Sequence, residues 1–437
     1  MSLLPLEDPV TTSEATQEFT DGHALVSTAE PSPRALESSA SKPGPSKSGP
    51  SELGPSKSGP SEPASLERAR RLVLPATRAA VARLEPDLAR VVGYHLGWID
   101  AAGSAATGSS GKALRPALAL LSAQAAGADA AVGVPAAVAV ELVHNFSLLH
   151  DDVMDADTER RHRPTAWSVF GVGPAILAGD ALLGLAMEVL LERAAPSDAN
   201  DLGEANDLRG GLGIGGGLGI GGGLGRMGGD RDPTAARAAA ALAKATGKLI
   251  AGQSQDLAFE RREAVEPDEY LVMAAGKTAA LLACACSLGA VLAAGSEELV
   301  GHLEAFGWHI GLAFQAIDDL LGIWGHPQVT GKPVGNDLRQ RKKTLPVAVA
   351  LTHGGPSAVD LARLLAVGVN DDEEVALATT LITQAGGRDA TTAEADRQLH
   401  LALAQLDAAA GRTTTGMSTQ VHRELVELAH FTTRRER

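Results

Sequence analysis

Two groups of aspartates stand out because they lie in otherwise apolar sequence. The first comprises Asp151, Asp152 and Asp155, and the second comprises Asp318 and Asp319. Residues four apart on a helix project from the same face, so Asp151 and Asp155 would lie one turn apart. Carboxylates in apolar surroundings are costly unless cations neutralise them. Two helices that face each other with these groups would form an oxygen-lined site for Mg²⁺ and a diphosphate.

The sequence around both clusters predicts an all-α fold. From Ser65 to about residue 432, long stretches rich in Ala and Leu alternate with short breaks rich in Gly, Pro and Asp. The alternating apolar and polar residues of half-buried strands are almost absent. Ser65 is a residue type that commonly caps the start of a helix. We therefore expect a multi-helix bundle, with the two Asp-rich helices lining a central cavity.

Two segments differ in composition from this bundle. Residues 1–64 are rich in Ser, Pro and Gly and contain the sequence GPSKSGPSE twice. Such a segment buries too little apolar surface to order itself, so we expect a disordered tail. Residues 196–233 contain GLGIGG twice in tandem and are predicted to be a Gly-rich flexible insertion. A dinucleotide-binding fingerprint would require a strand and a helix around these glycines, and neither is visible. Residues 65–437 are expected to form a single domain.

Composition and charge restrict the possible functions. The chain has 437 residues and a formal net charge of -15, which argues against nucleic-acid binding. Its only cysteines, Cys284 and Cys286, lie in an apolar stretch and would diverge on a helix, so we expect them to be buried and unbonded in a reducing compartment. The apolar run at residues 278–294 is predicted to be a buried bundle helix and not a membrane span. With no secretory signal pattern, a cytoplasmic location is expected.

Several basic residues could bind a diphosphate. Arg160 and Arg161 closely follow the first aspartates, and Lys112 and Arg115 are three apart and can point together. Arginine side chains match phosphate oxygens in bidentate geometry. Lys277 lies in an apolar stretch, where an ammonium group needs an anionic partner. Each basic segment alone could be a solvated surface, but arginines beside three carboxylates favour a metal–diphosphate site.

Taken in order, these motifs resemble those of the trans-isoprenyl diphosphate synthases, or polyprenyl synthetases. The resemblance runs over nearly all of residues 80–430 outside the glycine-rich insertion. Besides the two acidic clusters, it rests on the motifs GKALRP at 111–116, RRHRPT at 160–165, GKTA at 276–279, GKPVGNDL at 331–338 and KKTLP at 342–346. It implies a bundle of the isoprenoid synthase type, a homodimer, and an Mg²⁺-dependent prenyltransferase that joins isopentenyl diphosphate to allylic diphosphates.

The resemblance also implies a role for each candidate residue. Three Mg²⁺ ions per active site would be held by Asp151, Asp152, Asp155, Asp318 and Asp319. The isopentenyl diphosphate would be bound by Lys112, Arg115, His144 and Arg161. The allylic diphosphate would be bound by Arg160, Lys277 and Lys332, with Thr278, Gln315 and Lys342 around it.

Three positions depart from the family pattern. Ser110–Ala113 replaces the usual Gly-Gly-Lys-Arg, so one supporting cation is missing. His162 stands where glycine is usual. Gly322 stands where the second cluster usually has a third aspartate. Two carboxylates and water can still hold Mg²⁺, although with lower affinity.

The length of the product should depend on the side chains below the first cluster. Phe146 lies five residues before Asp151, which is about 7.5 Å along a helix. Ser147 beside it is small, and no insertion widens the acidic cluster. This combination resembles the family members that make C20 products, so geranylgeranyl diphosphate is expected, with farnesyl diphosphate or a longer chain as alternatives.

Two other functions stay open from the sequence. A class I terpene cyclase would share the metal site and the bundle, but it needs no second diphosphate site. A non-catalytic partner subunit is suggested by Gly322 and the long tail, whereas the complete first cluster argues against it. A purely structural helical protein would leave the buried charges uncompensated.

Overall fold

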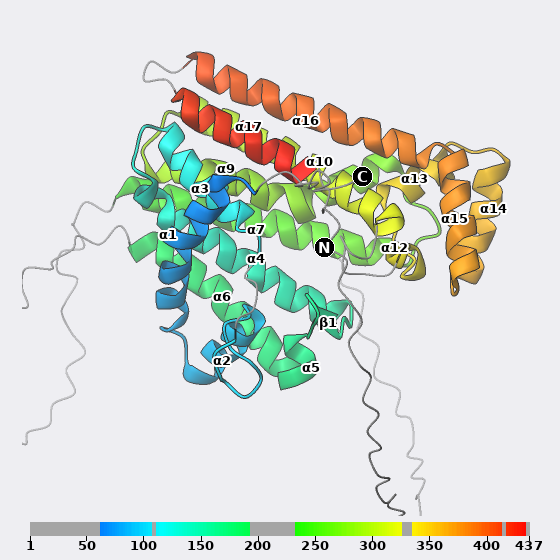
Figure 1. The fold of residues 1–437 in the computed structure, drawn as a ribbon, viewed down its shortest axis with the longest axis horizontal. Coiled ribbons are helices and arrows are strands. Elements are labelled where there is room, and N and C mark those ends of the chain that lie inside the picture. Colours follow the sequence, from blue (N-terminus) through cyan, green and yellow to red (C-terminus); the bar gives the residue numbers. More distant parts are fainter. Residues whose placement is uncertain (1–61, 107–110, 193–231, 326–333, 413–416, 434–437) are drawn as a thin grey trace, which may run out of the picture. The chain divides into compact units, whose positions relative to one another are not determined.

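The computed structural model describes residues 62–106, 111–192, 232–325, 334–412 and 417–433. These residues all belong to one compact unit. The expected tail, apart from its last three residues, and all but the last two residues of the glycine-rich insertion lie outside the described part. The described chain is almost entirely helical, which confirms the predicted all-α class (Figure 1).

The helices before the insertion carry the first acidic cluster. They are α1 (Ala64–Val81), α2 (Pro86–His95), α3 (Leu114–Ala125), the short η1 (Ala130–Gly133), α4 (Val134–Met154), α5 (Ala166–Phe170) and α6 (Val172–Glu192). Between α4 and α5 the chain forms a small antiparallel hairpin of β1 (Glu159–Arg160) and β2 (Arg163–Pro164). The hairpin follows directly on the Asp-rich end of α4.

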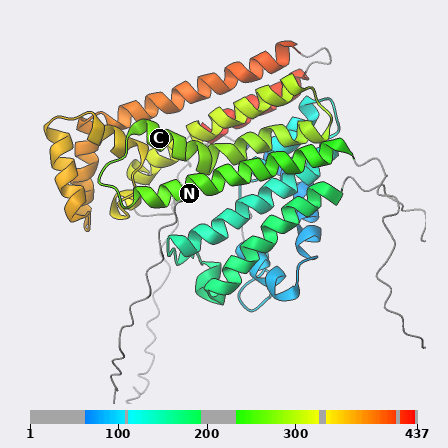
Figure 2. The same ribbon diagram turned by 180° about the vertical axis from the view of Figure 1, so that it is seen from behind.

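The helices after the insertion carry the second cluster. They are α7 (Pro233–Phe259), α8 (Pro267–Ala274), the π-helical η2 (Ala275–Ala279), α9 (Ala280–Leu292), α10 (Glu297–Trp324), α12 (Asn336–Arg339), α13 (Leu345–Thr352), α14 (Pro356–Val367), α15 (Asp372–Gln384), α16 (Gly387–Arg412) and α17 (Thr419–Thr433). Figure 2 shows α7 as the long green helix that crosses the molecule, where it packs against α9 and α6.

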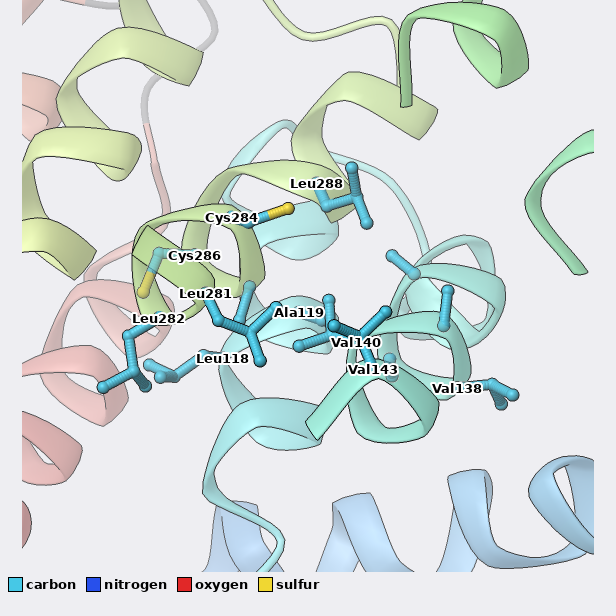
Figure 3. Packing of buried hydrophobic residues seen from close by; sticks show 14 of the residues in the cluster. Leu118, Ala119, Val138, Val140, Val143, Leu281, Leu282, Cys284, Cys286 and Leu288 are labelled. Atoms are coloured by element: carbon cyan, nitrogen blue, oxygen red, sulfur yellow. The ribbon is translucent and has the colours of Figure 1, made fainter. Parts of the chain in front are cut away.

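The core forms where α3, α4 and α9 meet. Leu118 of α3, Val140 of α4 and Leu281 of α9 are almost fully buried (Figure 3). Ala and Leu combine high helix propensity with apolar side chains. The helix α9 is rich in both and is buried along its whole length. This agrees with the buried bundle helix predicted at residues 278–294. The core fixes the position of α4, which carries the first acidic cluster at its end.

Both cysteines are buried and unbonded, as expected. The sulfur atoms of Cys284 and Cys286 point in different directions in Figure 3. Burial raises the pKa of the Cys284 thiol to about 12 and that of Cys286 further still. Thiols that stay protonated are poor nucleophiles and metal ligands. The two cysteines therefore act as small apolar core residues.

Three described stretches have the length and hydropathy of a membrane-spanning helix. They are Ala130–Met154, Val172–Glu192 and Pro267–Leu292. The first and third are mostly buried against other helices, whereas only 39% of the tested window of Val172–Glu192 is buried. The absence of a membrane span therefore stays a prediction from the sequence.

Candidate active site

The first acidic cluster lies at the carboxyl end of α4. Asp152 is buried, and Asp151 and Asp155 are partly exposed. Burial raises the pKa of Asp151 to about 6, because the nearby cations Lys277 and Arg160 only partly offset the loss of hydration. The cluster is therefore a site of incompletely neutralised negative charge.

The hairpin that follows α4 brings Arg160 to this cluster. Its two central residues, Arg161 and His162, have φ values of 53° and 59°. A two-residue turn of this kind requires left-handed backbone at both positions, which explains why glycine is usual at 162. Nε of Arg160 donates to Oδ1 of Asp152 at 2.6 Å. The second carboxylate oxygen of Asp152 is buried and has no protein partner. Asp152 thus holds the Arg160 guanidinium beside the cluster.

Lys277 lies on the π-helical turn η2, a type of turn that often occurs at functional sites. Gly252 of α7 packs directly against this turn, where a Cβ at position 252 would overlap the backbone nitrogen of Lys277. This close approach lets Asp256, one turn further along α7, form an ion pair with Lys277. Although burial lowers the pKa of Lys277, the carboxylates of Asp256 and Asp151 raise it overall. The anionic partners predicted for this lysine are therefore present.

The second acidic cluster is held by neutral donors. Asp319 is buried and accepts hydrogen bonds from Nε2 of Gln315 at 2.9 Å and from the backbone N–H of Leu345 at 3.0 Å. The hydroxyl of Tyr270 also donates to it. Burial nevertheless raises the pKa of Asp319 to about 7. Tyr270 was missed by the sequence analysis, because no spacing in the chain links it to α10.

The π-helical turn connects the two clusters. Lys277 lies near the carboxylates of Asp151 and Asp155, and the hydroxyl of its neighbour Thr278 donates to Oε1 of Gln315 at 2.6 Å. Nζ of Lys342 is 4.0 Å from Oδ2 of Asp155. The loop of Lys342 precedes Leu345, whose backbone N–H binds the second cluster. The helices α4 and α10 are therefore bridged at their Asp-rich ends by the same few residues.

A second basic group lies further back along α4. The guanidinium of Arg161 lies over Gly111, 3.2 Å from where a Cβ at this position would be. Burial and the positive charges of Arg115 and Arg161 lower the pKa of His144 well below its usual value, so this histidine is neutral. Burial raises the pKa of Glu141 despite the nearby Arg115, and this carboxyl was missed by the sequence analysis. Arg115, His144 and Arg161 therefore lie close to one another, and their role in binding isopentenyl diphosphate stays a prediction.

His95 of α2 is a further neighbour that the sequence analysis missed. Burial, Arg160 and Arg161 lower the pKa of His95 to about 3, so it is a neutral hydrogen-bonding partner. It lines a small pocket with Asp152, Arg160 and Arg161. No periodicity or motif in α2 marked this histidine as different from an ordinary core residue.

Of two further predicted basic residues, one is not brought to the clusters and the other is not described by the structure. Lys112 is exposed, and its Nζ lies 5.7 Å from the ring centroid of Phe431 on α17. Lys332 lies outside the described residues. The contribution of these two side chains to diphosphate binding stays a prediction.

The carboxylates at the two clusters could hold Mg²⁺ together with a diphosphate, but not by themselves. Among the residues that the structure describes, no three His, Cys, Asp or Glu side chains are close enough to hold a metal by themselves. Mg²⁺ is usually bound by one or two carboxylates, with phosphate oxygens and water completing its octahedral shell. The unpartnered oxygen of Asp152 and the raised pKa values of Asp151 and Asp319 indicate negative charge that a cation would neutralise.

Comparison with known proteins agrees with this geometry. The family model for polyprenyl synthetase matches residues 97–382. A (2E,6E)-farnesyl diphosphate synthase of Mycobacterium bovis is 43% identical over 367 residues, which are 83% of this chain and 90% of that protein. A geranylgeranyl diphosphate synthase of Mycobacterium tuberculosis is 44% identical over 344 residues, which are 78% of this chain and 88% of that protein.

Solved structures show the same fold. A polyprenyl synthetase from Streptomyces coelicolor superimposes with a TM-score of 0.72 at 47% identity, covering 84% of this chain and 98% of that one. A geranylgeranyl pyrophosphate synthase from Corynebacterium glutamicum, complexed with isoprenyl diphosphate and magnesium, superimposes with a TM-score of 0.66 at 25% identity and covers 86% of this chain and 100% of that one. The chain therefore belongs to the polyprenyl synthetase family and is a prenyltransferase that makes trans-polyprenyl diphosphates.

Proposed function

We propose that this protein uses Mg²⁺ to condense isopentenyl diphosphate with allylic diphosphates and that its main product is geranylgeranyl diphosphate. The observation that carries the Mg²⁺-dependent reaction is the bridge at η2, where Lys277 lies near the carboxylates of Asp151 and Asp155 and Thr278 donates a hydrogen bond to Gln315 of the second cluster. An allylic diphosphate bound between the clusters would contact carboxylate-bound metal on both sides. The magnesium complex of the Corynebacterium glutamicum enzyme supports the choice of metal.

The residues have distinct tasks in this reaction. Three Mg²⁺ ions would be held by Asp151, Asp155 and Asp318. They would stabilise the negative charge that develops on the leaving diphosphate. Arg160, held by Asp152, and Lys277, held by Asp256, present fixed positive charge to the same group. The C–O bond of the allylic substrate breaks, and its electron pair leaves with the diphosphate.

The second substrate would lie against the basic group on α4. Arg115 and Arg161 would bind the isopentenyl diphosphate, with the neutral His144 as a hydrogen-bonding partner. Its double bond then attacks the allylic cation, a new C–C bond forms, and a proton leaves to the departed diphosphate. A class I terpene cyclase would have no use for this second basic group, which supports the synthase.

The C20 product is supported by the side chains of α4 below the first cluster. At 3.6 residues per turn, Ser147 lies one turn below Asp151 on nearly the same face. Its hydroxyl donates to the carbonyl of His144 at 2.9 Å, so it occupies little space. The ring of Phe146 packs edge-on to His150, at 4.8 Å between centroids. His150 in turn contacts the carbonyl of Ile176 on α6. A short side chain below Asp151 leaves room for a growing chain.

A homodimer is supported by an exposed apolar surface on α6. Leu177 is 58% exposed, Val172 is 47% exposed and Ile250 of the neighbouring α7 is 49% exposed. Exposed apolar patches on soluble proteins commonly mark protein interfaces. Light scattering of the purified protein would test the homodimer.

The buried, protonated thiols are consistent with the cytoplasmic location expected from the sequence.

Product analysis tests the proposed activity. The purified protein is incubated with Mg²⁺, isopentenyl diphosphate and one of three starters, dimethylallyl, geranyl or farnesyl diphosphate, and products are identified by mass. The proposal predicts a C20 diphosphate as the main product from all three starters. A main product of C15, or of more than C20, would contradict the chain length. Hydrocarbon formed from an allylic diphosphate alone would indicate a cyclase, and activity only with a second protein would indicate a partner subunit.

A further inference from the structure

A cavity lies between α10 and α16, apart from the two acidic clusters. The two helices pack against each other (Figure 1), and the cavity between them has a volume of about 260 Å³. Its walls are Ile317, Leu320, Leu321 and Trp324 of α10 with Arg388 and Thr392 of α16. Most of this lining is apolar.

The cavity is turned away from the acidic clusters. Its apolar residues on α10, from Ile317 to Trp324, follow the spacing of one helical face. The stripe that carries the second cluster, from Gln315 to Gly322, follows the same spacing two residues earlier. Two residues correspond to about 200° around an α-helix. The cavity and Asp318 therefore lie on opposite sides of α10, and the cavity is a separate site.

Polar contacts outside the cavity hold α16 on α10. Nδ1 of His309 lies 2.6 Å from Oε1 of Gln398, and Nδ1 of His302 lies 2.9 Å from Oε1 of Gln405. Since the amide oxygen of glutamine can only accept, each histidine donates in these pairs. A ligand could therefore enter the cavity without breaking either pair.

The polar side chains of the cavity are a guanidinium and a hydroxyl. The guanidinium of Arg388 lies over the ring of Trp324, 5.3 Å from its centroid, and within the described part of the chain no carboxylate pairs with it. The hydroxyl of Thr392 has no hydrogen-bond partner among the described residues, whereas that of Thr391 donates to the carbonyl of Gly387 at 2.8 Å. The apolar walls are thus accompanied by a permanent positive charge and a hydroxyl that are both available to a ligand.

The size and the charge of the cavity define the class of ligand. A water molecule takes roughly 30 Å³ of liquid volume and a methylene group is of similar size, so the cavity holds on the order of nine methylene groups. One guanidinium matches one carboxylate in bidentate geometry. A diphosphate carries more charge than Arg388 alone neutralises, and the exposed Asp389 beside it would repel a second negative charge. The cavity therefore fits an apolar chain with a single carboxylate.

We propose that the cavity between α10 and α16 binds a monocarboxylate with an apolar chain of about ten carbons. Its carboxylate pairs with Arg388 and accepts from the hydroxyl of Thr392, and its chain packs against Leu321 and Trp324. The inference goes beyond the proposed function, because none of these residues has a part in the condensation.

Isothermal titration calorimetry of the full-length protein, without Mg²⁺ or substrates, tests the site. Decanoate is the probe, and decyltrimethylammonium carries the same chain with the opposite charge. Decanoate should bind with one molecule per chain and a Kd on the order of 0.1–1 mM, as expected for a ligand of this size. Decyltrimethylammonium should bind at least about tenfold more weakly, because its charge is the same as that of Arg388.

Variants of the cavity locate the bound decanoate. Thr392→Phe fills the cavity from α16 and should weaken binding at least about tenfold. Arg388→Gln removes the charge of an exposed side chain and should weaken binding about threefold to tenfold. Arg423→Gln, on the exposed surface of α17, removes the same charge elsewhere and should leave the Kd unchanged.

Three results would overturn the inference. The first is a wild type that shows no saturable decanoate binding. The second is an unchanged Kd in either Thr392→Phe or Arg388→Gln, because decanoate would then bind elsewhere in the molecule. The third is geranyl diphosphate that binds more tightly than decanoate and loses this affinity in Arg388→Gln, because the cavity would then select a diphosphate. None of these results depends on whether the protein turns over its proposed substrates.

Discussion

The two acidic clusters differ in how their carboxylates are held. In the first, charged partners dominate: Asp152 pairs with Arg160, and Asp155 lies near Lys342. In the second, Asp319 is buried among neutral donors. Ion pairs with partly exposed cations can rearrange when a metal–diphosphate complex enters, whereas a buried carboxylate with three donors cannot. Under the proposed function, the first cluster is the more adaptable of the two, whereas Asp319 of the second cluster is fixed in the fold and leaves Asp318 for binding.

The largest effect on turnover is expected from removing the carboxylate that each cluster is proposed to use for binding metal. Asp151→Ala and Asp318→Ala should each lower kcat by about a hundredfold to a thousandfold, because each removes stabilisation of the leaving diphosphate. Circular dichroism should show an unchanged helical content. Asp360→Ala on the surface serves as the control. Turnover close to the wild-type rate in either variant would contradict the assignment.

The two clusters should differ in how much their buried carboxylates contribute to the free energy of unfolding. Asp319→Asn replaces an acceptor by an amide that cannot accept from Tyr270, Gln315 and Leu345 together, so it should lower the free energy of unfolding by about 1–3 kcal/mol. Asp152→Asn should mainly lower turnover, because Arg160 loses its charged partner. Chemical denaturation of both variants measures the difference. Equal stability loss in the two would contradict the distinction.

Product length should depend on the side chains of α4 below the first cluster, and not on the second cluster. Ser147→Phe places a ring one turn below Asp151 and should shift the main product from C20 to C15. Phe146→Ala opens space beside His150 and should lengthen the product. Mass analysis of the products measures both shifts. If neither variant changes the distribution, the chain is limited elsewhere in the molecule.

The smallest effect concerns pH. Burial raises the pKa of Asp151 to about 6 and of Asp319 to about 7, above the ordinary value of 3.8. A carboxyl with a raised pKa in the folded state favours folding most at pH values below 3.8, and this contribution is lost as pH rises through its folded pKa. The metal-free protein should therefore lose roughly 1–2 kcal/mol of stability between about pH 5 and pH 8 relative to Asp319→Asn. Denaturation curves for both proteins at several pH values would show this, and parallel pH profiles would contradict it.

Much of the fold and part of the site could be predicted from the sequence. Ala- and Leu-rich periodicity was sufficient for the all-α class, and the spacing of Asp151 and Asp155 placed both on one side of α4. Tyr270 and His95 could not be predicted, because their contacts with Asp319 and with the Arg160 region depend on how distant helices pack. Residues joined only by tertiary packing leave no local pattern.

The central claim is that one diphosphate binds between α4 and α10 through metal held on both sides. A crystal structure of the protein with Mg²⁺ and inorganic pyrophosphate tests it most directly. We expect carboxylate oxygens of both Asp151 and Asp318 at about 2.1 Å from Mg²⁺ ions that share the same pyrophosphate. Metal bound at only one of the two aspartates, or pyrophosphate bound away from α10, would contradict the account.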